Sequence, residues 1–251
     1  MNNQSLTKKL LETFQDRQRI SRAEISSFLR SVQGPLLDDD YLGWILYNLR
    51  KKGRLELLDH EEYRMVRKKP AFTPEINKFI SQIHTSLHTN NGPEKYCVWD
   101  TVWLNEFLEL QALNTMIILE VQKEFTDHTF HKLRDEGLKN VFLKPDTSVI
   151  ERYIAENEHS IVIKPLISRS PTKIIKSVPT ASMEKILVDI FCEPELFIAY
   201  QGGQIMKIVV AADEKYMLNY DKMRSYAKRR HREDEIFKVI HNLIDFQSDN
   251  M

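Results

Sequence analysis

The chain is poor in the residues that build phosphate-binding loops and disulfide frameworks. It has seven glycines and two cysteines in 251 residues, and no G-x-x-x-x-G-K-[ST] or G-x-G-x-x-G pattern occurs. An H-E-x-x-H motif and a nucleophile elbow are also missing. Cys97 and Cys192 lie far apart in apolar segments and match no familiar zinc-site spacing. The sequence therefore predicts no catalytic residue, no cofactor and no metal site.

The chain also lacks long hydrophobic runs, and neither basic nor acidic residues are in excess. No apolar run approaches about 18 residues, the length of a membrane span, and the polar start is unlike a signal peptide. We therefore expect a cytoplasmic protein without a membrane partner. Basic and acidic residues balance at 36 each, but residues 1–69 hold 14 basic and 10 acidic side chains, and residues 70–251 hold 22 and 26. This asymmetry favours nucleic-acid contact by the N-terminal part.

The first 69 residues have the pattern of three helices followed by a β-hairpin. Apolar residues recur at helical spacing over residues 4–15, 21–33 and 41–52, and Ser21 with Glu24 makes a capping box for the second helix. Gly53 ends the third helix. Residues 54–58 and 63–66 then alternate around a polar turn, which predicts a hairpin. This order predicts a winged helix-turn-helix over residues 1–69, with a recognition helix and a wing.

The outward face of the third helix carries aromatic, amide and cationic side chains. Asn48 is the candidate base reader because an amide pairs bidentately with adenine, and the arginines of the hairpin are candidates for phosphate contact. We expect double-stranded DNA to be bound by Arg22, Tyr41, Trp44, Asn48, Lys51, Lys52, Arg54, Arg64 and Arg67. The alternatives are a solvated charged surface, with Trp44 packed against another domain, or a module that binds only protein.

Residues 70–251 alternate short apolar strands with helices and become helical toward the end. Strands are predicted over 96–99, 115–121, 141–143, 160–164 and 174–176. Helices are predicted over 74–87, from a Thr73 cap with Pro74 in the first position, and over 102–108, 124–136, 181–191, 196–226 and 233–246. The pattern predicts a larger mixed α/β domain over 70–251 with a helical C-terminal part, so the whole chain is expected to be α+β or α/β.

One group of residues raises the question of a metal-dependent nuclease. Asp100 precedes the strand that ends in Glu120, and Lys123 follows it. Carboxylates of this kind bind magnesium in nucleases, and a lysine positions the nucleophile. Because side chains alternate along a strand, Glu120 and Lys123 would point to opposite faces. We therefore favour an ordinary sheet strand, and keep a nuclease with a winged-helix targeting domain as the alternative.

Two segments of the second part resemble a known family. The run Glu184-Lys185-Ile186-Leu187-Val188-Asp189 looks like the E-K-x-L-V-D helix of AbiEi-type abortive-infection antitoxins, and the run Tyr226-Ala227-Lys228-Arg229 is similar to the Y-A-x-R helix that follows it there. The segment from Tyr96 to Thr101 is like the family's strand entering its second domain. The motif residues carried over are Glu184, Lys185, Asp189, Tyr226, Arg229 and Arg230.

The resemblance implies the antitoxin of a type IV toxin–antitoxin system. Such a protein represses its own operon by binding the promoter through its winged helix, and counteracts a nucleotidyltransferase-like toxin without necessarily forming a stable complex. From the residues themselves, Asp189 is expected to pair with Arg229 or Arg230 and to fix the packing of the last helices. A structural role for these residues is favoured over a catalytic one, because no nucleophile or metal set accompanies them.

Overall fold

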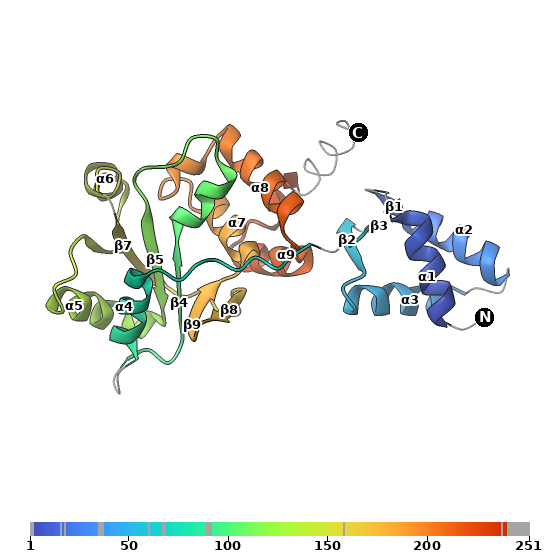
Figure 1. Ribbon diagram of the computed structural model, residues 1–251, viewed down its shortest axis with the longest axis horizontal. Helices are drawn as coiled ribbons and strands as arrows, with labels where there is room; N and C mark the ends of the chain where they lie inside the picture. Colours follow the sequence, from blue (N-terminus) through green and yellow to red (C-terminus); the bar gives the residue numbers. More distant parts are fainter. Residues whose placement is uncertain are drawn as a thin grey trace.

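The computed structural model describes residues 3–15, 17, 19–34, 38–59, 61–66, 69–88, 92–157, 159–236 and 238–239. The fold is mixed α+β, as the sequence predicts. A smaller N-terminal part made of helices and a hairpin lies beside a larger part built on a six-stranded sheet (Figure 1). The hairpin is the side of the N-terminal part that faces the larger part.

The N-terminal part has the predicted element order, with one additional short strand. It comprises α1 (Asn3–Phe14), β1 (Ile20–Ser21), α2 (Arg22–Gln33), α3 (Asp39–Lys51), β2 (Leu55–Asp59) and β3 (Glu62–Met65). The strands form an antiparallel sheet in the order β1-β3-β2. The capping box is present: Ser21 Oγ accepts from Glu24 N, and Ser21 N donates to the Glu24 carboxylate. The apolar stripes of all three helices meet in one core.

The larger part is organised around the sheet β6-β7-β5-β4-β9-β8. Its strands are β4 (Tyr96–Asp100), β5 (Met116–Val121), β6 (Val141–Leu143), β7 (Ser160–Pro165), β8 (Thr172–Ile175) and β9 (Val178–Ala181). Strands β5, β6 and β7 run parallel, so their carboxyl ends lie at one edge. Strand β4 is antiparallel to β5 and parallel to β9. Every residue of β4 and β5 is buried, which makes this pair the centre of the core.

Helices surround the sheet in two groups. The elements are α4 (Lys78–Leu87), η1 (Thr101–Phe107), η2 (Lys123–Phe125), α5 (Thr126–Asp135), α6 (Thr147–Val149), η3 (Ile150–Ile154), α7 (Met183–Cys192), η4 (Ile198–Tyr200), α8 (Gly203–Lys215) and α9 (Tyr220–Arg229). Helix α5 packs against β6 and β7 and contacts α4, whereas α7 packs against β9 and contacts both α8 and α9. Helix α9 also contacts β2, so it joins the two parts.

The structure differs from the predicted elements in several places, and α6 and η3, over residues 147–154, were not predicted. Helix α4 begins at Lys78 and not at Pro74, because Asn77 is its cap: the Asn77 amide accepts from Ile80 N at 2.8 Å and donates to Asp100 at 3.2 Å. Strand β9 was missed because it contains a proline. The long helix predicted over 196–226 is divided into η4, α8 and α9, and most of the helix predicted over 233–246 lies outside the described residues.

Buried apolar residues form two clusters. One contains residues of α1, α2, α3 and the small sheet. The other spans Phe72 to Val239 and also takes in Leu58 of β2. The hairpin therefore contributes to both cores. Within the described part of the chain, no helix has the length and apolar character needed to cross a membrane.

Candidate nucleic-acid interface

Helix α3 has a buried face and an exposed face, as its periodicity predicts. Asp38 caps the helix by accepting from Tyr41 N at 2.7 Å, and the positive end of the helix dipole also favours this carboxylate. The buried face consists of Leu42, Ile45, Leu46 and Leu49. The side chains of α3 that are expected to face DNA, Tyr41, Trp44, Asn48 and Lys51, lie outside this buried face.

The exposed face of α3 is aromatic at its centre. The rings of Tyr41 and Trp44 stack at a centroid distance of 5.8 Å and an angle of 11° between planes. Trp44 remains 51% exposed, and Tyr47, which the sequence analysis did not single out, is 61% exposed. Lys51 Nζ lies 5.9 Å from the centroid of the Tyr47 ring. The i,i+4 spacing of Tyr47 and Lys51 was the signal that could have identified Tyr47.

Asn48 is held by its own helix in a way that leaves it able to read a base. Its Nδ2 donates to the carbonyl oxygen of Trp44, four residues earlier, at 2.8 Å. This bond uses one of the two amide N–H groups. The other N–H and the carbonyl oxygen are the groups that a bidentate contact with adenine requires.

Basic side chains continue from the end of α3 into the hairpin. Lys51, Lys52 and Arg54 are exposed. Arg22 is half-buried at the opposite end of α3, and its guanidinium lies 3.7 Å from Asp39. The Asp39 carboxylate weakens the electrostatic attraction between Arg22 and a phosphate. The C-terminal end of α3 therefore attracts phosphate more strongly than its N-terminal end does.

A hollow of about 410 Å³ lies between α1 and α3. Four of its ten lining residues come from α1, which the sequence analysis did not connect with DNA, and six come from α3 and the residues that directly follow it. The lining residues are Leu6, Thr7, Lys8, Leu11, Trp44, Ile45, Asn48, Leu49, Lys52 and Arg54. We call this feature the α1–α3 hollow. It contains four of the residues expected to bind DNA: Trp44, Asn48, Lys52 and Arg54.

The hairpin arginine Arg64 was expected to contact phosphate, but the structure buries its side chain against carboxylates of the protein. Arg64 is only 8% exposed. Its Nη1 and Nη2 lie 3.0 Å from the two carboxylate oxygens of Asp213 in α8, and Nη2 also contacts Glu56 at 3.0 Å and the Tyr220 hydroxyl at 3.1 Å. The second part covers this face of the hairpin, so Arg64 binds protein acids where a phosphate was expected.

Other basic residues of the same region also turn to the second part. Arg50 forms a 2.6 Å ion pair with Asp221 of α9, and Lys69 donates to the carbonyl oxygen of Asp213. Arg67, the remaining arginine of the predicted set, lies outside the described residues. The acids of α8 and α9 therefore pair with Arg50, Arg64 and Lys69, whereas Lys51, Lys52 and Arg54 remain exposed.

The Arg64–Asp213 contact sets the ionisation of both partners. Burial alone would raise the pKa of Asp213, but Arg64, together with Lys69 and the Tyr220 hydroxyl, outweighs this effect and lowers the pKa from 3.8 to about 2. Burial also raises the pKa of Glu56, against the opposing pull of Arg64. Burial opposes the charge of Arg64, but Tyr220, Asp213 and Glu56 together raise its pKa above the ordinary value, so the guanidinium stays charged. The joint between the two parts is therefore an ionised, buried cluster.

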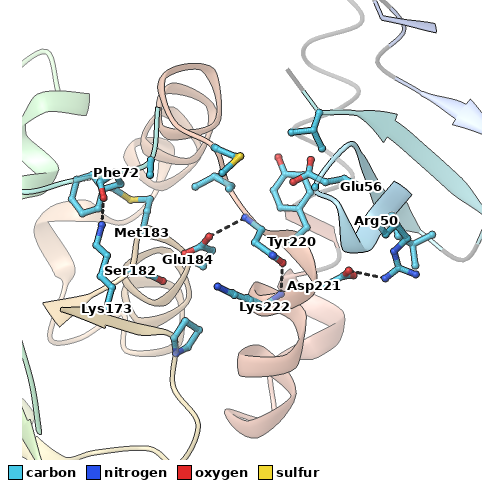
Figure 2. A pocket seen from close by; sticks show the side chains of 18 of the residues that line it. Arg50, Glu56, Phe72, Lys173, Ser182, Met183, Glu184, Tyr220, Asp221 and Lys222 are labelled. Carbon is cyan, nitrogen blue, oxygen red and sulfur yellow. Dashed lines mark hydrogen bonds and ion pairs between the residues drawn. The ribbon is translucent and has the colours of Figure 1, made fainter. Parts of the chain in front are cut away.

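A pocket of about 300 Å³ lies beside this cluster, between the hairpin and the start of α9 (Figure 2). The Arg50–Asp221 pair lies on one side of it, and on the other side Lys173 donates to the carbonyl oxygen of Phe72. Between them, Glu184 accepts from the backbone N–H of Asn219 at 2.9 Å. The motif residue Glu184 thus orients the turn that leads into α9.

Most of the other motif residues come together inside the second part. Lys185 and Asp189 of α7 form a completely buried ion pair. The Tyr226 hydroxyl donates to Asp189 at 2.7 Å, and Arg230 Nη1 lies 3.1 Å from the same carboxylate. The expected pairing of Asp189 with Arg230 is confirmed. Arg229 instead donates to Ser168 at 3.3 Å on the surface.

The nuclease candidate Glu120 belongs to this same buried cluster. Its carboxylate lies 2.6 Å from Lys185 and 3.4 Å from Lys164. Lys164 also pairs with Glu193 at 2.6 Å, and Glu193 contacts Arg230 at 2.6 Å. The cluster therefore balances three cations against three carboxylates, and it links β5 and β7 to α7 and to the end of α9. The sequence analysis missed Lys164 and Glu193 because they are distant in sequence.

Asp100 and Glu120 do not share a site. Strands β4 and β5 are antiparallel, with Asp100 opposite Ile117 and Glu120 opposite Cys97, so the two acids lie three register positions apart. Asp100 caps η1 through Val102 N at 2.9 Å, and Lys123 is exposed beyond the strand. Among the described residues, no group of three histidines, cysteines or acids is placed to hold a metal ion.

Comparison with known proteins identifies a family without assigning an activity. A search of curated proteins finds no match. The model of one protein family matches residues 41–245, from the start of α3 through the second part. The matched segment includes both the exposed face of α3 and the buried Lys185 cluster. The chain therefore belongs to the Family of unknown function (DUF6577).

Proposed function

We propose that this protein is a DNA-binding transcriptional regulator, in which residues 1–69 act as a winged helix-turn-helix and α3 is the recognition helix. A single helix carrying side chains that reach base edges fits the major groove of DNA. The observation that carries the proposal is the exposed face of α3. It presents stacked Tyr41 and Trp44, the amide of Asn48, and the exposed cations Lys51 and Lys52.

We further propose that the regulator is a cytoplasmic antitoxin of the type IV class that represses its own promoter and counteracts a nucleotidyltransferase-like toxin. Its support is the resemblance of the motif helices, together with the position of their residues. Lys185, Asp189, Tyr226 and Arg230 pack into one buried cluster, which explains physically why these residue types occur together.

The DNA-binding proposal is tested by fluorescence anisotropy with the DNA upstream of the protein's own gene. We expect binding that weakens steeply with salt, because cations that contact phosphates release counterions. Trp44→Ala should weaken binding, whereas Tyr153→Ala is the matched control: Tyr153 is an aromatic residue of similar exposure, 54%, on the second part. Equal affinities in the two variants would contradict the proposed role of α3.

The antitoxin proposal has a separate test. If an adjacent reading frame encodes a nucleotidyltransferase-like protein, its expression alone should arrest growth, and co-expression of this chain should restore it. A protein that binds only other proteins would show no salt-sensitive DNA binding in the first experiment. A nuclease would cleave the upstream DNA when a divalent cation is added.

A further inference from the structure

The two surfaces that carry basic residues in the N-terminal part have different surroundings. The hairpin face meets acids of the second part, because Arg64 pairs with Asp213 and Arg50 with Asp221. The α1–α3 hollow has only basic charges along its described lining: Lys8, Lys52 and Arg54. All three of these side chains are exposed. Three exposed cations that can attract an external polyanion are therefore grouped around the hollow.

The hollow combines apolar and cationic surface in the way that a sugar–phosphate strand requires. Leu6, Leu11, Ile45 and Leu49 are apolar lining residues, and Trp44 adds an aromatic surface. The three cations come from α1, from the end of α3 and from the segment that follows it. Sugar carbons can rest on apolar side chains while the flanking phosphates contact Lys or Arg. An apolar ligand alone would make no use of those three cations.

The ion pair already present at Lys8 does not prevent such contact. Lys8 Nζ lies 3.7 Å from Glu12, but the two side chains are 77% and 60% exposed. Exposed pairs of this type are weak and are screened by salt. A phosphate that approaches the hollow can therefore replace Glu12 as the partner of Lys8.

We propose that the α1–α3 hollow binds one sugar–phosphate strand of duplex DNA, with Lys8, Lys52 and Arg54 as phosphate ligands. The inference rests on the proposed function and makes it specific. Helix α1 takes the phosphate-binding role that the sequence pattern assigned to Arg64 of the hairpin. Asn48 and Trp44 lie on the same lining, so the strand that contacts these cations passes directly beside the candidate base reader.

The test compares two lysines that are adjacent in sequence. Lys8 lines the hollow; Lys9 is equally exposed on α1 but is not part of the lining. Lys8→Ala and Lys9→Ala remove the same charge, and alanine preserves the helix. We expect Lys8→Ala to flatten the slope of log affinity against log salt by about 0.9, and Lys8→Ala with Arg54→Ala by about twice as much. Lys9→Ala should leave the slope of the wild-type protein unchanged.

Each outcome is informative. If the wild-type protein binds duplex DNA with a steep salt dependence but Lys8→Ala and Lys9→Ala give the same slope, the hollow is not the phosphate site, and the proposal is wrong while the proposed function stands. This is also the result expected if the hollow binds an acidic protein segment instead. If the wild-type protein shows no salt-dependent binding to any duplex, both proposals are wrong. Circular dichroism of the variants confirms that α1 remains folded.

Discussion

Arg64 of β3 and Asp213 of α8 form a bidentate ion pair, with both N–O distances at 3.0 Å. The pair joins the hairpin to the second part of the chain and is sealed by Tyr220, whose hydroxyl donates to Asp213 at 2.6 Å. Bidentate arginine–carboxylate contacts are geometrically specific. The position of the hairpin relative to the second part therefore depends on a pair of residues that belong to different parts of the sequence.

This pair predicts a defined acid sensitivity. Because the pKa of Asp213 is lowered to about 2 in the folded protein, its carboxylate stabilises the fold at pH values above its ordinary pKa of 3.8. That contribution, about 2 kcal/mol, is lost as the pH falls from about 4 to about 2. In urea unfolding, the stability difference between wild type and Asp213→Asn should shrink over this window. A difference that stays constant from pH 6 to pH 2 would show that the contact does not lower the pKa of Asp213.

The Arg64–Asp213 and Arg50–Asp221 ion pairs, which join the hairpin region to the second part, should differ in strength. Asp213→Ala leaves Arg64 buried without its main partner and should lower the free energy of unfolding by about 3–5 kcal/mol. Asp221→Ala breaks the exposed Arg50–Asp221 pair and should cost about 0–1 kcal/mol. Chemical denaturation of both variants checks the ranking, and a larger loss in Asp221→Ala would contradict it.

The buried cluster around Lys185 should respond as a unit. Lys185→Met leaves the Glu120 and Asp189 carboxylates buried without their shared cation, which should cost about 3–5 kcal/mol. Adding Glu120→Gln restores the balance, with Lys164 and Arg230 paired with Glu193 and Asp189, and should recover part of the loss. Lys207→Met is the control, because the Lys207–Glu109 pair is exposed. A Lys185→Met, Glu120→Gln double variant less stable than Lys185→Met would argue against charge compensation as the reason for this cluster.

Base reading by Asn48 can be separated from general DNA affinity. Asn48→Ala should weaken binding to the cognate site by about 1–3 kcal/mol and affect random DNA much less, because only the cognate contact uses the amide. The matched measurement is Lys52→Ala, which should weaken both DNAs alike. The same loss on cognate and random DNA in Asn48→Ala would rule out base reading by this residue.

Incubation of the protein with supercoiled plasmid and Mg²⁺ or Mn²⁺ tests the nuclease alternative. We expect no cleavage, because Asp100 and Glu120 lie three register positions apart and the Glu120 carboxylate already forms ion pairs with Lys185 and Lys164. Glu120→Gln serves as the comparison. Cleavage that requires metal and disappears in Glu120→Gln would assign the second part a catalytic role.

Local sequence patterns determined most of the secondary structure. The apolar stripes of α1, α2 and α3 and the Ser21–Glu24 capping box depend on residues within a few positions of each other, so they could be read directly. The same holds for the central strands β4, β5 and β7, whose apolar runs are continuous. Prediction failed where a distant residue decided the outcome. Asn77 caps α4 while also donating to Asp100, and β9 exists because β4 and β8 pair with it.

The aromatic, amide and cationic side chains on the exposed face of α3 could be predicted from the sequence, because a helix with one apolar face must present its remaining side chains outward. The partners of the Arg64 and Lys185 side chains were determined only by the tertiary structure. Arg64 looked like a phosphate ligand until α8 placed Asp213 against it, and Lys185 looked like an ordinary helix residue until β5 and α9 surrounded it with Glu120, Asp189 and Tyr226. A charged side chain has no fixed partner in the sequence, and its role depends on which opposite charge the fold brings within about 3 Å of it.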